Sequence, residues 1–275
     1  MKKFASFLIT ASAVIGVAQF ACMGAANAEA EKDAKPMGFS FEGPFGKFDK
    51  AQLQRGYKVY KEVCSNCHSM RFINFRNLAD KGGPGFNEEQ VKELAKSFKI
   101  HDVSDKGENF DRPGLASDVF PAPFATPDAA AAALGAAPPD LSLITKAREG
   151  WHGTFNQLIN GIGGPQYVYS LLTGYEKPPA ELVKEAPTGK YYNPYFVNGP
   201  WISMTPPLAD GQVAFDDGAP NKVDDMAKDV ATFLAWTAEP KMEERKQTGL
   251  EVLIYLLILA GLLYAVKRKI WADIH

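Results

Sequence analysis

The segment YKEVCSNCHSM, residues 60–70, holds two of the three cysteines of the chain and one of its four histidines. Cys64, Cys67 and His68 form the pattern Cys-x-x-Cys-His, which indicates covalent attachment of a c-type haem. Two thiols at this spacing can each form a thioether with one vinyl group of a single haem, and the adjacent imidazole can bind the iron. The segment therefore predicts a haem site with one axial ligand beside the point of attachment.

Two other uses of a Cys-x-x-Cys pair fit this sequence less well. A structural zinc site needs four ligands, but the sequence contains no second pair of this kind, and Cys22 lies in a segment expected to be removed. A thioredoxin-like redox pair requires a strand-helix-strand setting, whereas the pattern around Cys64 is helical. Covalent haem is the interpretation that the rest of the chain has to support.

The second axial ligand decides what such a haem can do. Methionine closes the iron site and raises the reduction potential, whereas an open position would permit substrate binding. Position and elimination favour Met204, in the proline-stiffened segment WISMTPPLADG. The other methionines of the exported part are less suited by their place in the chain: Met37, Met70, Met226 and Met242. His101 and His152 are competitors, each in a segment expected to be a polar loop.

Both ends of the chain carry membrane signals. A basic start, an apolar stretch and a small-residue site at Ala26-Asn27-Ala28 predict a cleaved signal peptide over residues 1–28. Residues 249–266 are apolar except for Glu251 and precede three cations, which predicts a transmembrane anchor helix. The signal peptide orients the anchor, so residues 29–248 are expected to form a periplasmic domain and residues 267–275 a cytoplasmic tail.

The charge of the chain disfavours nucleic-acid binding. The formal net charge is −2, and several of the cations lie in the two membrane-associated ends, so the exported part is more acidic than the whole. Acidic residues in its loops and on the late helix are a set that could steer a basic partner: Glu108, Asp111, Asp216, Asp217, Asp224 and Asp225.

Periodicity and capping residues predict a mainly helical domain. Asp49 is expected to begin a helix that delivers Cys64 at its C-terminal end, and Asn221 a late amphipathic helix with Phe233 on its buried face. Shorter helices are expected over 88–98 (capped by Asn87), 127–134 (capped by Thr126), 141–149 and 166–173. Strand patterns are scarce, and residues 101–125 and 175–220 are predicted to be long ordered loops.

An early helix that bears the haem cysteines and a late helix beside it is the organisation of class I cytochromes c. Gly56 would allow the two helices to approach closely, and Phe233 and Trp236 would help to wall the haem. The expected fold class is therefore mainly α: a class I cytochrome c-like haem domain with long ordered loops and one C-terminal transmembrane helix.

Several stretches, in this order, resemble the cytochrome c1 family, the haem subunits of the cytochrome bc1 complex, in its alphaproteobacterial form. They include FSFEGPFGKFDKAQLQRGYKVYKEVCSNCHSM, RPGLASDVFPAPF, PPDLSLITKAR, YSLLTGY, YYNPYF, MTPPL, FDDGAP and AKDVATFLAWTAEP. The resemblance assigns Cys64 and Cys67 to the thioethers of one haem c, and His68 and Met204 to the iron. It also places Arg148 and Tyr167 beside the haem propionates, with Pro138 and Pro139 on the His68 side.

The function that the resemblance implies is one-electron transfer from a Rieske iron–sulfur protein to a soluble, basic cytochrome c. The chain would be an electron carrier without catalysis of its own, assembled with cytochrome b in a dimeric complex of the bacterial inner membrane. One alternative is another membrane-anchored c-type cytochrome, such as a stand-alone shuttle or an oxidase subunit. A second is an enzyme that works at an open haem iron, which Met204 argues against.

Overall fold

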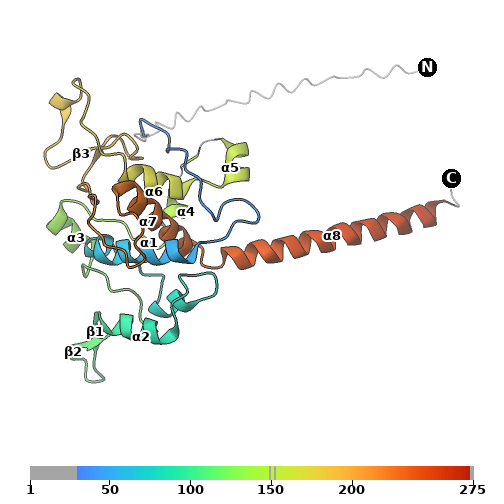
Figure 1. Cartoon of the computed structure of the whole chain (residues 1–275), viewed down its shortest axis with the longest axis horizontal. Coiled ribbons are helices and arrows are strands. Elements are labelled where there is room, and N and C mark those ends of the chain that lie inside the picture. Colours follow the sequence, from blue (N-terminus) through green and yellow to red (C-terminus); the bar gives the residue numbers. More distant parts are fainter. Residues whose placement is uncertain (1–29, 149, 152, 273–275) are drawn as a thin grey trace, which may run out of the picture.

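The computed structural model describes residues 30–148, 150, 151 and 153–272, so the predicted signal peptide and His152 lie outside it. The described part is mainly helical, as predicted (Figure 1). Its helices are α1 (Lys50–Glu62), α2 (Glu88–Lys96), α3 (Pro127–Leu134), α4 (Ile144–Ala147), α5 (Thr154–Asn160), α6 (Gly164–Leu172), α7 (Val223–Ala238) and α8 (Met242–Trp271). Short 3-10 turns cover Cys64–Asn66, Phe75–Ala79 and Val183–Glu185.

Helices α1 and α7 lie against each other at the centre of the domain (Figure 1). A Cβ atom at Gly56 of α1 would lie 2.1 Å from the carbonyl oxygen of Asp229 and 2.7 Å from Cβ of Phe233, both in α7. Only glycine permits this approach, which confirms the predicted role of Gly56. The close contact packs α1, which leads into the Cys64 segment, against the buried face of α7.

Aromatic side chains fill the core between these helices. The ring of Tyr57 lies 5.7 Å from that of Phe233, and the ring of Tyr60 lies 5.9 Å from both Phe233 and Phe120. Trp236, fully buried, continues the cluster at 5.7 Å from Phe233. Such ring pairs stabilise a core beyond the area they bury. The expected buried face of α7 is thus confirmed.

Local capping signals place the starts of α1, α2 and α3. The side chain of Asp49 accepts a hydrogen bond from Gln52 N at 2.7 Å, and Thr126 accepts one from Ala129 N at 3.1 Å. Asn87 and Gln90 form a reciprocal capping box. These side chains satisfy backbone N–H groups that a helix start leaves without partners, so the three predicted starts are confirmed.

The predicted N-cap of α7 is wrong. The N-cap residue is Lys222, and the N–H of Val223 is satisfied from a distance by Asp210 Oδ1 at 2.8 Å. The Asn221 amide instead donates to the carbonyl oxygen of Val213 at 3.0 Å. A loop carboxylate therefore replaces the local cap.

Three further expectations differ from the structure. The helix expected over 141–149 is confined to α4, because Gly150 packs against the backbone of Gly163; a Cβ there would lie 1.8 Å from its carbonyl oxygen. Helix α5 was not expected. The segment predicted as a loop from residue 101 overlaps an antiparallel hairpin of β1 (Lys99–Val103) and β2 (Asn109–Pro113), and the later loop holds the short pair β3 (Tyr191–Tyr192) and β4 (Trp201–Ile202).

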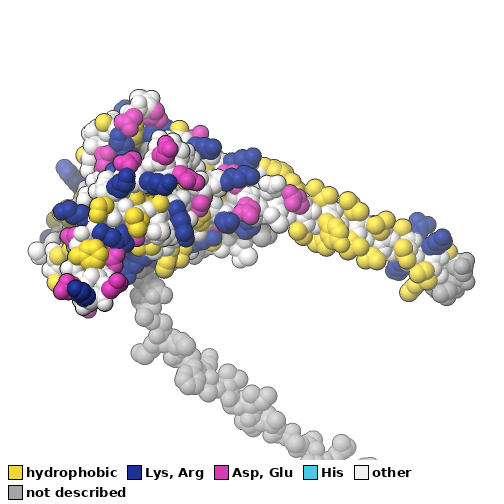
Figure 2. Space-filling model, turned by 90° about the horizontal axis from the view of Figure 1, so that it is seen from below, with side chains coloured by type: hydrophobic (Ala, Val, Ile, Leu, Met, Phe, Trp, Pro, Cys, Tyr) yellow, Lys and Arg dark blue, Asp and Glu magenta, His cyan; other side chains and the backbone are white. Residues whose placement is uncertain are grey.

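Helix α8 projects away from the domain (Figure 1) and carries an apolar surface that ends in a basic cluster (Figure 2). It has 30 residues and a mean hydropathy of 2.3 in its most apolar window. Among the described residues it is the one helix long and apolar enough to cross a membrane. The predicted anchor over 249–266 lies within it, but the helix begins earlier, at Met242, which is buried against the domain.

Candidate haem-binding site

The Cys-x-x-Cys-His segment folds into a tight turn at the C-terminal end of α1. The N–H groups of Cys67 and His68 donate to the carbonyl oxygen of Cys64 at 3.1 and 2.9 Å. This turn brings the two thiols and the imidazole together on one short segment. Both thiols are free and half-buried, so neither is used in a disulfide and both are available for thioether formation.

The ring of His68 is oriented by the backbone of a distant segment. Nδ1 lies 2.7 Å from the carbonyl oxygen of Pro139, and in that pair the ring N–H donates to the carbonyl. Burial lowers the pKa of His68, although the Pro139 hydrogen bond opposes the shift. The neutral tautomer protonated on Nδ1 leaves Nε2 with a lone pair, which is the form that binds a metal.

Asp140 fixes the loop that follows His68. One carboxylate oxygen accepts from the Ser69 hydroxyl at 2.7 Å and from Arg71 N at 3.0 Å, and the other accepts from Ser142 N at 2.9 Å. Burial raises the pKa of Asp140, but these hydrogen bonds outweigh it and hold the pKa below its ordinary value. No local sequence pattern indicates this bracing role, because Ser69 and Arg71 lie far from Asp140 in the chain.

The donor set suits haem better than zinc. Within the described ranges, no group of three or more His, Cys, Asp or Glu side chains is arranged to hold a metal ion. Burial raises the pKa of the Cys64 thiol to about 12, with a smaller contribution from Cys67. Two free thiols beside an imidazole with a free Nε2 match the chemistry of covalent haem attachment, and the residues present therefore fit the group.

Arg148 and Tyr167 are brought together by α4 and α6. Arg148 follows α4 in extended conformation and is half-buried, while Tyr167 is 5% exposed on α6. The helices meet closely, because a Cβ at Gly164 would lie 1.6 Å from the carbonyl oxygen of Thr145. Burial raises the pKa of Tyr167, and its hydrogen bond with Arg148 acts in the opposite direction. The two predicted propionate-side residues therefore form one polar pair.

Met204 lies half-buried just after β4, and its carbonyl oxygen accepts a hydrogen bond from the Tyr175 hydroxyl at 3.1 Å. Met70 and Met226 are fully buried core residues. His101 is in β1 rather than in a loop; its side chain is 90% exposed and pairs with Asp111. The second competitor, His152, lies outside the described residues.

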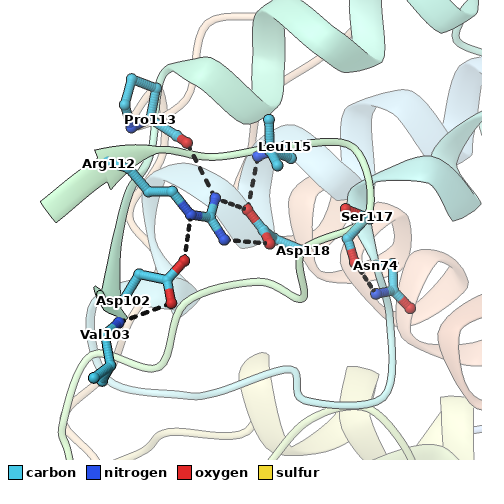
Figure 3. Close-up of polar contacts among 8 residues, drawn as sticks. All are labelled: Asn74, Asp102, Val103, Arg112, Pro113, Leu115, Ser117 and Asp118. Atoms are coloured by element: carbon cyan, nitrogen blue, oxygen red, sulfur yellow. Dashed lines mark hydrogen bonds and ion pairs between the residues drawn. The ribbon is translucent and has the colours of Figure 1, made fainter. Parts of the chain in front are cut away.

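A further loop, residues 114–120, braces the chain just after the haem segment (Figure 3). Arg76 N donates to Ala116 O at 2.7 Å, Phe75 N donates to Asp118 O at 3.0 Å, and Asn74 Nδ2 donates to Ser117 O at 2.5 Å. Arg112, from β2, ties this loop to the hairpin through the Asp118 carboxylate. The brace positions Phe120 in the aromatic core beside Tyr60.

Asp216 and Asp217, in the loop before α7, form ion pairs with cations of α1. Asp217 accepts from Arg55 at 2.8 Å, and Arg55 also pairs at 2.7 Å with Asp229, which is buried in α7. Asp216 pairs with Lys58 at 3.0 Å, but its side chain is 93% exposed. Asp217 therefore belongs to a network that joins α1 to α7, whereas Asp216 also presents its charge to solvent.

The domain is mainly helical, and its Cys-x-x-Cys-His turn has two free thiols and a histidine with Nε2 available to a metal. It ends in one apolar helix. These features define the class of c-type cytochromes with one membrane anchor. The sequence profile of the Cytochrome C1 family matches residues 39–274. The chain belongs to this family, whose members are subunits of the cytochrome bc1 complex that carry electrons on one covalent haem c.

The chain is also similar in sequence to known cytochrome c1 proteins. The chain is 43% identical over 273 residues to cytochrome c1 of Cereibacter sphaeroides, with 91% of each chain covered. It is 44% identical over 239 residues to the mitochondrial cytochrome c1 haem protein of Saccharomyces cerevisiae, with 86% of this chain and 71% of that protein covered. It is 52% identical over 256 residues to cytochrome b/c1 of Bradyrhizobium diazoefficiens, a match to 89% of this chain but only 37% of that protein.

Proposed function

We propose that the haem of this chain accepts one electron from a Rieske iron–sulfur protein and passes it to a soluble, basic cytochrome c. The observation that carries the proposal is the Cys-x-x-Cys-His turn with His68 held through Nδ1 by Pro139. Bound haem supplies a one-electron couple of the iron, and closed coordination of that iron favours electron transfer over substrate chemistry.

The residues have separate roles in this proposal. Cys64 and Cys67 form the thioethers, His68 and Met204 bind the iron, and the Arg148–Tyr167 pair faces the propionates. A guanidinium can pair with a carboxylate through two parallel hydrogen bonds, and its positive charge favours the reduced haem. The prolines of the 203–207 segment stiffen the chain around Met204.

The proposal includes the membrane topology of the chain and its assembly with other subunits. The haem domain lies in the periplasm, α8 crosses the bacterial inner membrane once, and the C-terminus is cytoplasmic. The chain assembles with cytochrome b and the Rieske protein in a dimeric complex. Three cations flank each side of the apolar stretch, so this orientation rests on the predicted signal peptide and not on charge.

Three experiments test the proposal. Purification in mild detergent should recover the chain with a b-type cytochrome and a Rieske protein, and rapid mixing should show reduction of its haem by the Rieske centre. Single Cys64→Ser and Cys67→Ser variants should retain little haem on denaturing gels. Full covalent haem in both variants would reject the thioether assignment, and recovery without a b-type cytochrome would reject the assembly.

A further inference from the structure

A groove of about 840 Å³ lies where α8 leaves the domain. Phe41 and Phe48, which precede α1, form part of its apolar wall, and Leu250 and Leu253 of α8 also line it. Leu250 and Leu253 belong to the apolar part of the helix that is long enough to cross a membrane. The groove therefore extends from the surface of the domain to the edge of the bilayer.

The walls of the groove are fixed in place by hydrogen bonds. Lys246 Nζ donates to Phe41 O at 2.6 Å and to Gly46 O at 3.3 Å. Glu243 accepts from Phe48 N at 2.9 Å. These bonds, here called the neck clamp, attach the 41–48 segment to the first turns of α8. The groove is thus preformed, which lowers the entropy that a ligand loses on binding.

Charged residues of both signs line the polar end of the groove. The cations are Lys146, Arg245 and Lys246, and the anions are Glu42 and Glu239. Glu239 pairs with Lys146 at 3.2 Å and also with Arg245. A ligand that carries only one charge would match part of this lining, whereas a zwitterionic group with a phosphate and a cation would match both signs.

Gln166 adds an independent sign of a ligand. It lines the groove and is only 1% exposed. Its amide nitrogen donates to Met37 O at 2.9 Å and to the Glu42 carboxylate, so the nitrogen is satisfied. Its side-chain oxygen is buried and has no hydrogen-bond donor among the described residues. Buried acceptors are normally satisfied, so this oxygen calls for an N–H or O–H donor from outside the described residues.

We propose that the groove binds one phosphatidylethanolamine molecule of the membrane that α8 crosses. Its acyl chain lies along Phe41, Leu250 and Leu253, and its phosphate meets Arg245 and Lys246. Its ammonium group donates to the Gln166 side-chain oxygen near Glu42. Phosphatidylcholine lacks the N–H donor and phosphatidylglycerol lacks the cation, so both bind more weakly.

Native mass spectrometry of the haem-loaded full chain, released from nanodiscs of each of the three lipids, measures the occupancy. Wild type should retain one phosphatidylethanolamine about tenfold better than phosphatidylcholine, the ratio expected for one satisfied buried acceptor. Gln166→Leu should bring that ratio close to one. Equal retention of the three lipids by wild type would overturn the proposal.

Gly249→Phe provides a steric test that removes no charge or hydrogen bond. Gly249 lines the groove, and a Cβ there meets nothing within 4 Å, so the helix can accept the side chain. The variant should lose the bound lipid while its haem spectrum stays unchanged. Gly261→Phe is the matched control, equally open on α8 but outside the groove lining, and should keep the lipid. Unchanged lipid in Gly249→Phe, with loss of co-purifying cytochrome b, would identify a subunit interface and reject the lipid site.

Discussion

Arg112 donates two hydrogen bonds to the carboxylate of Asp118, at 2.6 and 3.0 Å, and its Nε donates to the carboxylate of Asp102 at 2.5 Å (Figure 3). The guanidinium holds the pKa of Asp118 below its ordinary value of 3.8, although burial acts against it. The folded state is therefore the weaker acceptor of this proton. The pair stabilises the fold at neutral pH, and its contribution disappears as the pH falls from about 3.8 through the lower folded pKa.

Asp118→Asn should destabilise the domain near neutral pH because it removes the charged partner of Arg112. The difference in melting temperature from wild type should shrink as the pH falls below about 3.8, since wild type then loses the same interaction. Calorimetry over a pH series measures both curves. Asp105→Asn, in the turn of the same hairpin and exposed, is the control and should follow wild type. A pH-independent difference for Asp118→Asn would contradict the argument.

Gly56→Ala should destabilise the domain by about 1–3 kcal/mol, the usual cost of overpacking. Alanine normally favours a helix over glycine, but here its Cβ would meet the Asp229 backbone at 2.1 Å. Denaturant unfolding of the haem-loaded chain gives the change in free energy. Gly261→Ala on α8, where the added Cβ meets nothing, is the matched control. A more stable Gly56→Ala chain would mean that α1 and α7 can separate without loss.

Met204→Leu should leave the haem covalently attached but lower its reduction potential by tenths of a volt. The thioether favours ferrous iron, and the identity of the axial ligands changes the reduction potential of a haem over a range of about 0.8 V. Redox titration measures the potential, and a pyridine haemochrome spectrum confirms the attachment. Met226→Leu removes a thioether from the fully buried core instead and should leave the potential in place. Equal potentials in the two variants would reject Met204 as the ligand.

Arg148→Gln should lower the potential by a smaller amount, because it removes a positive charge that disfavours oxidation of the haem. Lys146→Gln carries the same charge change two residues away, but its side chain is 52% exposed and pairs with Glu239. That variant should have a wild-type potential. If both variants shift the potential equally, the effect is the general field of the domain, and Arg148 has no special place beside the propionates.

Asp216→Asn should slow the reduction of a basic cytochrome c at low ionic strength, by up to about fivefold for one contact charge in water. Asp216 suits this test better than Asp217, because Asp217 shares Arg55 with the buried Asp229. The difference should fade near 0.15 M salt, where the screening length is about 8 Å. Stopped-flow mixing gives the rates, and Glu93→Gln on α2 is the control for charge. Equal rates at low salt would place the docking surface elsewhere.

Local signals in the sequence predicted what local contacts determine. Asp49, Asn87 and Thr126 satisfy N–H groups three residues away, so a short pattern contains the whole interaction. Gly56 was also predictable, because a glycine within an apolar helical face has few uses other than close packing. The Cys-x-x-Cys-His segment is local in the same sense, since all its parts lie in one turn.

Hydrogen bonds between residues far apart in the chain could not be predicted from the sequence. The carboxylate of Asp140 reaches Ser69 and Arg71, and Asp210 replaces Asn221 at the start of α7. In both cases an acidic side chain satisfies a group that lies far from it in the chain or in another loop. Similarly, the end of α4 is determined by the contact of Gly150 with Gly163, which no periodicity records.

Only three residues, Glu239 to Lys241, separate α7 from α8, and Met242 N bonds back to Glu239 O at 3.1 Å. Together with the neck clamp, this short connection removes any hinge between the domain and a helix about 45 Å long. In the proposed membrane topology, this connection would hold the Cys64 turn at a fixed height above the lipid surface. In the proposed electron transfer, the movement between donor and acceptor would then be made by the partner proteins.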